Sequence, residues 1–235
     1  MFDAKRLLDQ FTGAGAGGGN LGGMLQGKKG LATGAVAGGL ATYLLAGKKP
    51  KKLAKNALKF GGMAVIGGLA YKAWSDYQAG QAPATAAPAA GAAPAEPVIA
   101  APPAGTPFLP EAPAEQDLLG RALLRAMIAA AKADGHIDAD EQRRIFGHID
   151  QLELDADDKA FVFEELSKPL DVAAVAEPAT TPEMASEIYA ASLLAIDADG
   201  PAERGYLAML AARLNLPADL VAHLHANVDA ATDSA

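Results

Sequence analysis

The sequence predicts an all-α fold. Alanine is abundant, aromatic residues make up only 6% of the 235 residues, and apolar residues recur three and four positions apart over long stretches. This spacing is typical of amphipathic helices. Composition divides the chain into a basic glycine-rich region at 1–78, a Pro/Ala-rich linker at 79–114 and an acidic helical domain at 115–235. We expect glycine-rich helical segments at a membrane, a disordered linker and a bundle of about seven helices.

The net charge of −8 conceals a split along the chain. Up to residue 80, eleven Lys and Arg stand against three Asp, a net charge of +8, whereas the remainder carries −16. A basic front half suits an anionic membrane surface, and the acidic remainder disfavours nucleic acid as a partner. The sequence contains no cysteine, which excludes disulfides, thiolate metal ligands and cysteine nucleophiles.

The basic region contains two uncharged apolar runs, at 31–46 and 60–71. As a helix the first run would be roughly 24 Å long, which is short of the ~20 residues that a comfortable bilayer span needs. One span, a tight hairpin and a pair of helices lying on the surface are therefore all compatible with the sequence. Tyr71, Trp74 and Tyr77 end the second run and are typical of an interfacial aromatic belt. We expect this region to contact membrane lipid.

Glycines recur four residues apart at Gly30, Gly34 and Gly38. In lipid, small residues at this spacing allow helix backbones to approach closely, so this face predicts a homo-oligomer. The alternative is a flexible glycine-rich segment that stays in water. An acidic residue at Asp3, with no apolar run directly after it, argues against a cleavable signal peptide.

Nine prolines lie among alanines in the linker. Prolines this frequent forbid a continuous helix and favour an extended, solvated spacer between two separate bodies. The alternative is a proline-rich ligand for a partner domain, which the lack of adjoining basic residues disfavours.

The acidic domain shows helical spacing of apolar residues almost throughout. Pro182 follows Thr181 as the natural first residue of a helix. We expect Arg121 and Arg125 to form a solvated stripe, and His223 and His225 to point to different faces. The predicted helices occupy residues 115–133, 138–152, 155–167, 170–176, from 182 onward, 201–214 and 217–228.

An Asp-Gly phrase ends two of these helical patterns, 65 residues apart. The preceding stretches align without gaps, and a glutamate early in each following helix comes into register. This weak internal symmetry predicts a duplicated helix pair. The aligned positions are Leu123 with Ile188, Ile128 with Leu193, Ala129 with Leu194, Ala133 with Ala198 and Glu141 with Glu203.

Carboxylates gather at both corners, and carboxylate oxygens suit hard divalent cations such as calcium or magnesium. Neither corner completes a calcium-binding EF-hand loop, because apolar or basic residues occupy essential ligand positions. The candidate metal ligands are Asp134, Asp138 and Glu141 in the first corner and Asp197, Asp199 and Glu203 in the second.

The alternative interpretation of both corners is helix capping. Gly135 and Gly200 would then be left-handed C-terminal caps, and the acids would cap the next helices. Asp197 is harder to explain in this way, because it is predicted to lie within the preceding helix. That position favours the metal hypothesis.

Residue order in two stretches resembles a known family. The run Lys-Phe-Gly-Gly-Met-Ala-Val-Ile-Gly-Gly-Leu-Ala-Tyr-Lys at 59–72 resembles the YebE-like family of uncharacterised bacterial inner-membrane proteins. The helix, Asp-Gly, Glu and helix arrangement, with the run 202–217, resembles the TerB-like domain of tellurite-resistance proteins. The resemblance implies a TerB-like helical domain at the bacterial inner (cytoplasmic) membrane. It also implies a module that binds a ligand, metal or partner.

Together these observations predict a membrane-tethered, non-enzymatic binding or adaptor protein. Its helical domain would bind a divalent cation or a protein partner. The alternative is a glycine-zipper membrane protein whose main role is oligomerisation or envelope-stress-related membrane organisation. We expect no enzyme activity, because the serines occur in no nucleophile motif and no phosphate-binding loop is present.

Overall fold

The computed structural model describes residues 62–83, 101–133, 156–196 and 200–233. Across these ranges the regular structure is helical, which confirms the all-α class for the described part of the chain. The helices α5 and α7 to α11 begin within two residues of their predicted starts; the helix predicted at 138–152 lies outside the described residues. The helices are α4 (Gly62–Gln78), α5 (Pro113–Ala131), α7 (Ala156–Ser167), α8 (Val172–Ala176), α9 (Pro182–Ala195), α10 (Pro201–Arg213) and α11 (Ala218–Asp233).

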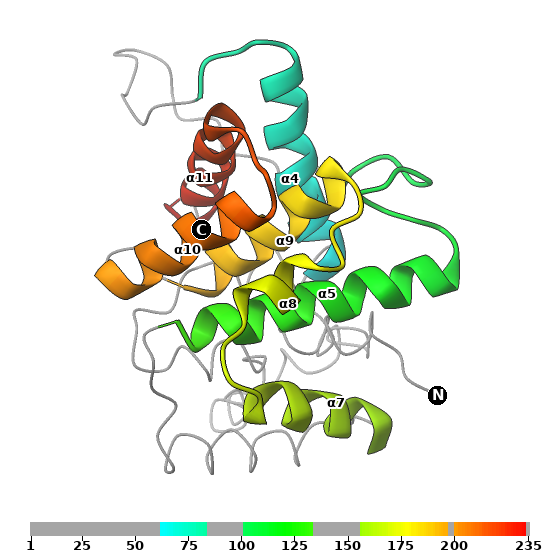
Figure 1. The fold of residues 1–235 in the computed structure, drawn as a ribbon. Coiled ribbons are helices and arrows are strands. Elements are labelled where there is room, and N and C mark those ends of the chain that lie inside the picture. The colour runs from blue at the N-terminus through cyan, green and yellow to red at the C-terminus, as the bar shows by residue number, and fades with distance from the viewer. Residues whose placement is uncertain (1–61, 84–100, 134–155, 197–199, 234–235) are drawn as a thin grey trace, which may run out of the picture.

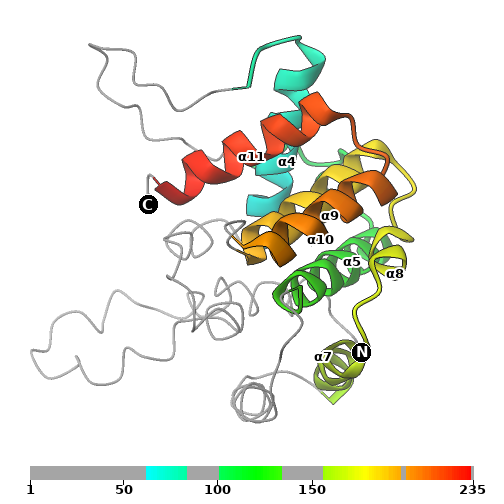
Figure 2. The same cartoon turned by 60° about the vertical axis from the view of Figure 1, so that its left-hand side comes forward.

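Helix α5 lies between α9 and α7, and α9 in turn packs against α4, α10 and α11 (Figures 1 and 2). Leu123 and Leu124 are completely buried, and Ile128 is almost so. Their repeat partners Ile188 and Leu193 on α9 are buried in the same core. The predicted correspondence of the two helices therefore coincides with a shared apolar interface.

Helix α4 packs against α9 and α11 within this core. Met63, Ile66, Ala70 and Ala73 are buried at spacings of three and four residues, as expected for one face of a helix. The sequence predicts a domain boundary at residue 78, between α4 and the acidic domain. In the structure, the buried apolar side chains of α4 pack against α9 and α11 and belong to the same hydrophobic core.

The aromatic residues of α4 also contact protein. Tyr71 meets Phe108 edge-on, with ring centroids 5.5 Å apart, and Tyr77 meets His223 at 6.5 Å. Trp74 stacks obliquely on Tyr77. These contacts differ from the predicted interfacial belt.

Part of the predicted linker packs in the same way. Phe108 is buried against α4 and belongs to the core cluster. Thr106 and Leu109 form an isolated antiparallel bridge within the turn that presents Phe108. Residues 101–112 thus cover α4 locally, in contrast to the predicted solvated spacer.

Among the helices that the structure describes, none has both the length and the apolar character required to cross a bilayer. The apolar run at 31–46 and the glycine face of Gly30, Gly34 and Gly38 lie outside the described residues.

Local sequence signals explain several helix ends. The Thr181 hydroxyl accepts from the Met184 backbone N–H at 3.2 Å, and Pro182 follows it at the first helical position, as predicted. At the end of α10, Asn215 adopts a left-handed φ of 53°. The backbone N–H groups of Asn215 and Leu216 donate to the Ala212 and Ala211 carbonyls, which is a Schellman motif.

Two glycines provide a matched test of the α4 interface. A Cβ at Gly67 would lie 2.5 Å from the Phe108 carbonyl oxygen, whereas a Cβ at Gly205 in α10 meets nothing within 4 Å. We expect Gly67→Ala to cost about 1–3 kcal/mol, because backbone must shift to admit the methyl group. Gly205→Ala should stabilise by about 0.5–1 kcal/mol through helix propensity. Urea denaturation of both variants measures the difference, and equal effects would contradict the packing described for α4.

Candidate functional site

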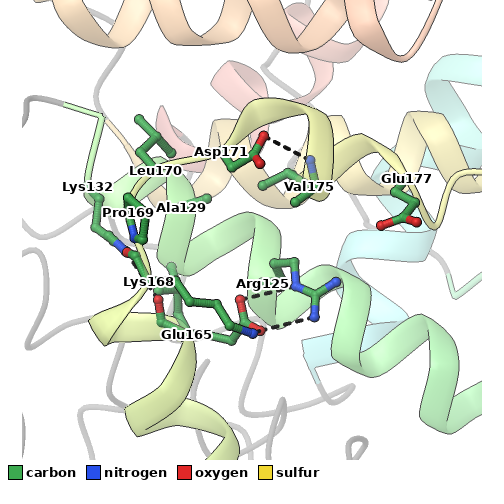
Figure 3. Close-up of a pocket in the computed structure, with 12 residues that line it drawn as sticks. Arg125, Ala129, Lys132, Glu165, Lys168, Pro169, Leu170, Asp171, Val175 and Glu177 are labelled. Carbon is green, nitrogen blue, oxygen red and sulfur yellow. Dashed lines mark hydrogen bonds and ion pairs between the residues drawn. The ribbon is translucent and has the colours of Figure 1, made fainter.

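A cleft of about 380 Å³ lies between α5, α7 and α8 (Figure 3). One wall comes from α5 and the C-terminal end of α7, and the other from α8 and the segment before it. Its lining combines charged side chains with an apolar surface. The lining residues are Arg125, Ile128, Ala129, Lys132, Glu165, Lys168, Pro169, Leu170, Asp171, Ala174, Val175 and Glu177.

An ion-pair cluster joins α5 to the end of α7 at the side of this cleft (Figure 3). The Arg125 guanidinium donates two hydrogen bonds to the Glu165 carboxylate, at 3.1 and 3.0 Å. Lys168 donates to the same carboxylate at 2.9 Å and also pairs with Glu164 at 2.7 Å. The Glu165 side chain is only 7% exposed, so paired hydrogen bonds of this kind are needed to offset the loss of hydration.

The pKa of Glu165 reflects two opposing effects, burial and the nearby cations. Burial by itself raises the pKa of this carboxyl, but hydrogen bonds and charges from Arg125 and Lys168 outweigh burial and hold the pKa below its ordinary value. The hydrogen bonds that Lys168 donates to the Glu164 and Glu165 carboxylates raise the pKa of Lys168. Glu165 is therefore ionised at neutral pH and committed to its two cations.

Lys132 links α5 to α7 in a different way. Its ammonium donates to the backbone carbonyl of Glu165 at 3.1 Å and to that of Lys168. Carbonyls at the C-terminal end of a helix carry partial negative charge and lack partners within the helix. Burial lowers the pKa of Lys132, while the charge of Glu165 opposes that shift. Lys132 thus caps α7 from the end of α5.

On the opposite wall, Asp171 caps α8. Its carboxylate accepts from the backbone N–H groups of Ala173 and Ala174, at 2.9 and 3.2 Å. The apolar part of the lining consists of the largely buried side chains of Ile128, Ala129 and Val175 and the exposed side chain of Leu170. This arrangement suits contact with a group that has an apolar body and a polar rim.

Of the predicted metal ligands, only Glu203 falls within the described residues; Asp134, Asp138, Glu141, Asp197 and Asp199 lie outside them. Glu203 is buried in the first turn of α10, and its carboxylate folds back over Gly200 into the position that a Cβ would occupy there. Among the described residues, no three His, Asp or Glu side chains form a metal-binding group.

The prediction of a left-handed cap at the second corner is wrong. Gly200 has φ −81° and ψ 153° and is the N-cap of α10, so it is not a left-handed C-terminal cap. The Glu203 carboxylate occupies the space where a Cβ at Gly200 would lie, so a side chain at this position would require the Glu203 side chain to move. Helix α9 ends at Ala195, and Ile196 is extended with φ −133°. Asp197, which was predicted to lie within that helix, is outside the described residues.

Sequence reasoning also missed the Arg125 cluster. Arg125 was expected in a solvated stripe with Arg121, yet it pairs with a carboxylate 40 residues away. Arg121 itself pairs with Asp117 and lies over the Phe161 ring, 5.6 Å from its centroid. No local spacing signals such pairs, because they depend on how α7 packs against α5.

Comparison with known proteins places the sequence among relatives without an assigned activity. A family model described as "Protein of unknown function (DUF533)" matches residues 30–228. A protein of Yersinia enterocolitica, named "Uncharacterized protein in ampR 5'region", is 33% identical over 98 residues, which cover 42% of this chain and 70% of that protein. No solved structure is significantly similar.

The Arg125–Glu165 pair yields a stability prediction. Arg125→Met should cost about 1–3 kcal/mol, because a nearly buried carboxylate loses two charged hydrogen bonds. Arg121→Met, on the same helix, should cost less than about 1 kcal/mol, since its pair with Asp117 lies within one helix and is more exposed than the Arg125–Glu165 pair. Denaturant unfolding of both variants at pH 7 provides the comparison.

The Arg125–Glu165 pair also predicts how folding stability depends on pH. Because the pKa of Glu165 is lowered in the folded state, its stabilising effect is complete above the ordinary glutamate pKa of about 4.3 and is lost as pH falls through the lowered value. The difference between wild type and Arg125→Met should shrink at acid pH. A difference that stays constant down to pH 3 would show that the pair does not act through the Glu165 charge.

Proposed function

Because the chain belongs to the DUF533 family, whose description assigns no activity, we propose a function from the geometry of its cleft. The protein acts as a membrane-tethered, non-enzymatic adaptor of the bacterial inner membrane. Its helical domain binds a protein partner in the cleft between α5, α7 and α8, in the manner of a TerB-like binding module. The observation that carries this proposal is the exposed Leu170 side chain at the rim of a cleft whose Arg125, Lys132, Glu165, Lys168 and Asp171 side chains are bonded to neighbouring groups.

Two features of the cleft favour binding over catalysis. Glu165 is held ionised by two cations, so it is a poor proton acceptor at neutral pH. Lys132 donates to two backbone carbonyls at the end of α7. Charges used in this way fix the shape of the cleft, while Leu170, with 37% of its surface exposed at the rim, offers an apolar contact.

The membrane tether rests on the sequence upstream of α4. Since residues 62–71 of the second apolar run pack into the helical domain, the proposed lipid contact falls on the run at 31–46, which lies between lysine pairs. Long lysine side chains flanking an apolar run can reach the headgroup region. A resemblance of 59–72 to YebE-like proteins supports the same location.

A photo-crosslinking amino acid at Leu170 tests the cleft in cells of the bacterium that encodes the chain. We expect one dominant protein adduct from Leu170, because the cleft presents one defined surface. The same amino acid at Met209 on α10, which is 54% exposed, controls for random encounter. Adducts are compared by gel shift and mass spectrometry.

A blocking variant decides whether an adduct reflects the cleft. Ala174→Phe fills the lining and should abolish the Leu170 adduct, whereas Ala173→Phe, on the exposed side of the same helix, should leave it intact. No adduct at Leu170, an identical pattern at Met209, or an adduct indifferent to Ala174→Phe would each refute partner binding in the cleft.

A divalent cation is the other proposed ligand, at the corners that contain Asp134, Asp138 and Glu141 and Asp197, Asp199 and Glu203. Calorimetric titration of the full chain with calcium and with magnesium should show saturable heat, because several carboxylates attract a hard cation. Asp134→Asn and Asp199→Asn should each weaken binding, and Asp219→Asn, in α11, should not. Absence of heat together with an unchanged Tm would leave these acids as helix caps.

A further inference from the structure

Glu187 is a buried carboxyl group outside the cleft, in the middle of α9. The residue has no exposed surface. Within the described part of the chain, neither carboxylate oxygen has a hydrogen-bond partner. An ionised carboxylate in this position would be extremely costly, and such groups become protonated instead.

The cover over Glu187 comes from two segments outside α9. The position of a Cβ at Gly67 of α4 lies 3.2 Å from Glu187 Oε1, 2.5 Å from the Phe108 carbonyl oxygen and 3.4 Å from Pro102 Cγ. Glu187 therefore sits opposite the bare backbone of α4, where residues 102–108 also close in. Its burial depends on α4 being docked.

We propose that docking of α4 onto α9 is linked to the uptake of one proton by Glu187, so that α4 is held most tightly at low pH. Docked α4 requires the neutral carboxyl, whereas an undocked α4 would leave Glu187 on an open helix face, where the carboxylate is hydrated. This linkage goes beyond the proposed adaptor function, because it makes the contact between the upstream segment and the helical domain responsive to pH.

The groups around Glu187 favour the neutral form. Burial raises the pKa of Glu187 well above its ordinary value, and the neighbouring charge of Glu183 adds to the shift. The Phe108 carbonyl oxygen and Glu187 Oε1 both approach the position of a Cβ at Gly67. A carbonyl oxygen carries partial negative charge and therefore repels a carboxylate. No nearby cation is among the causes of the shift.

The other titratable groups on the surrounding elements have different partners. On α4, Lys72 and Asp76 pair with each other at 2.7 Å. On α11, His223 faces Tyr77 and His225 bonds the Tyr189 hydroxyl at 2.9 Å. On α5 and α7, Arg121 pairs with Asp117 and Arg125 with Glu165. Tyr206 of α10 contacts Ser192, and Glu111 follows residues 102–108 in the chain.

The sign of the linkage follows from these environments. The docked state has the raised pKa, and the undocked state has a pKa near the ordinary glutamate value of about 4.3. Docking is therefore strongest at and below the ordinary value and weakens as pH rises toward the raised one. Within that window the docking equilibrium changes by up to about tenfold per pH unit, as for any single linked proton.

Amide hydrogen exchange of the full chain between pH 5.5 and 7.5 tests the proposal. After correction for the intrinsic exchange rate, protection of α4 amides should fall by up to about tenfold per pH unit, and α10 amides serve as the internal reference. Glu187→Gln is neutral at every pH and should abolish this dependence. Glu115→Gln, on an exposed position of α5, should retain it.

Two further measurements keep the test decisive. Glu187→Met replaces the carboxyl with an apolar group of similar size and should match Glu187→Gln, even if the buried amide is poorly tolerated. If neither variant folds, the carboxyl carbon shift of Glu187 in wild type must titrate well above pH 4.3. An ordinary pKa for Glu187, α4 protection that does not vary with pH, or wild-type dependence in both variants would overturn the proposal.

Discussion

The described structure depends on burial of α5 on more than one side. Helix α9 covers one side of α5, and α7 and α8 contact it elsewhere (Figure 2). Because Leu123, Leu124 and Ile128 are almost completely enclosed, α5 has little freedom to shift without opening several interfaces at once. The cleft inherits this rigidity, since Arg125, Ala129 and Lys132 all project from α5 into its lining.

Two buried glutamates, Glu165 and Glu187, have opposite pKa shifts because their surroundings differ. Glu165 keeps its charge because α5 delivers Arg125 and α7 delivers Lys168 to it. Glu187 faces the backbone of Gly67, and burial raises the pKa of its carboxyl well above the ordinary value. The first carboxyl holds two helices together at neutral pH, whereas the second makes an interface conditional. The two pKa shifts differ because cationic side chains surround Glu165, whereas the backbone of α4 faces Glu187.

Features that depend on residues close together in the sequence were predictable, and features that depend on contacts between distant residues were not. Helices such as α9 and α10 were predictable because apolar periodicity and the Thr181-Pro182 start are local signals. The place of α4 was not, because its glycines and aromatics suit a lipid surface and a protein core equally well. Glu165 and Glu187 could not be identified from sequence, since their partners lie on other helices. The cap at Gly200 was mistaken because one glycine can end a helix or begin the next.

Because α4 and α5 pack in one core, the Pro/Ala-rich stretch between them connects two helices of the same body, whereas the sequence predicted a spacer between separate bodies. It closes a loop within a single body, and loop closure cost grows only slowly with length, by about 0.6 kcal/mol per doubling. Such a connection keeps α4 near the surfaces of α9 and α11 against which it packs, at an effective concentration on the order of millimolar. A competing helix of equal affinity from another molecule must exceed this concentration to displace α4, so the surface that α4 covers is protected from outside helices without any further contact.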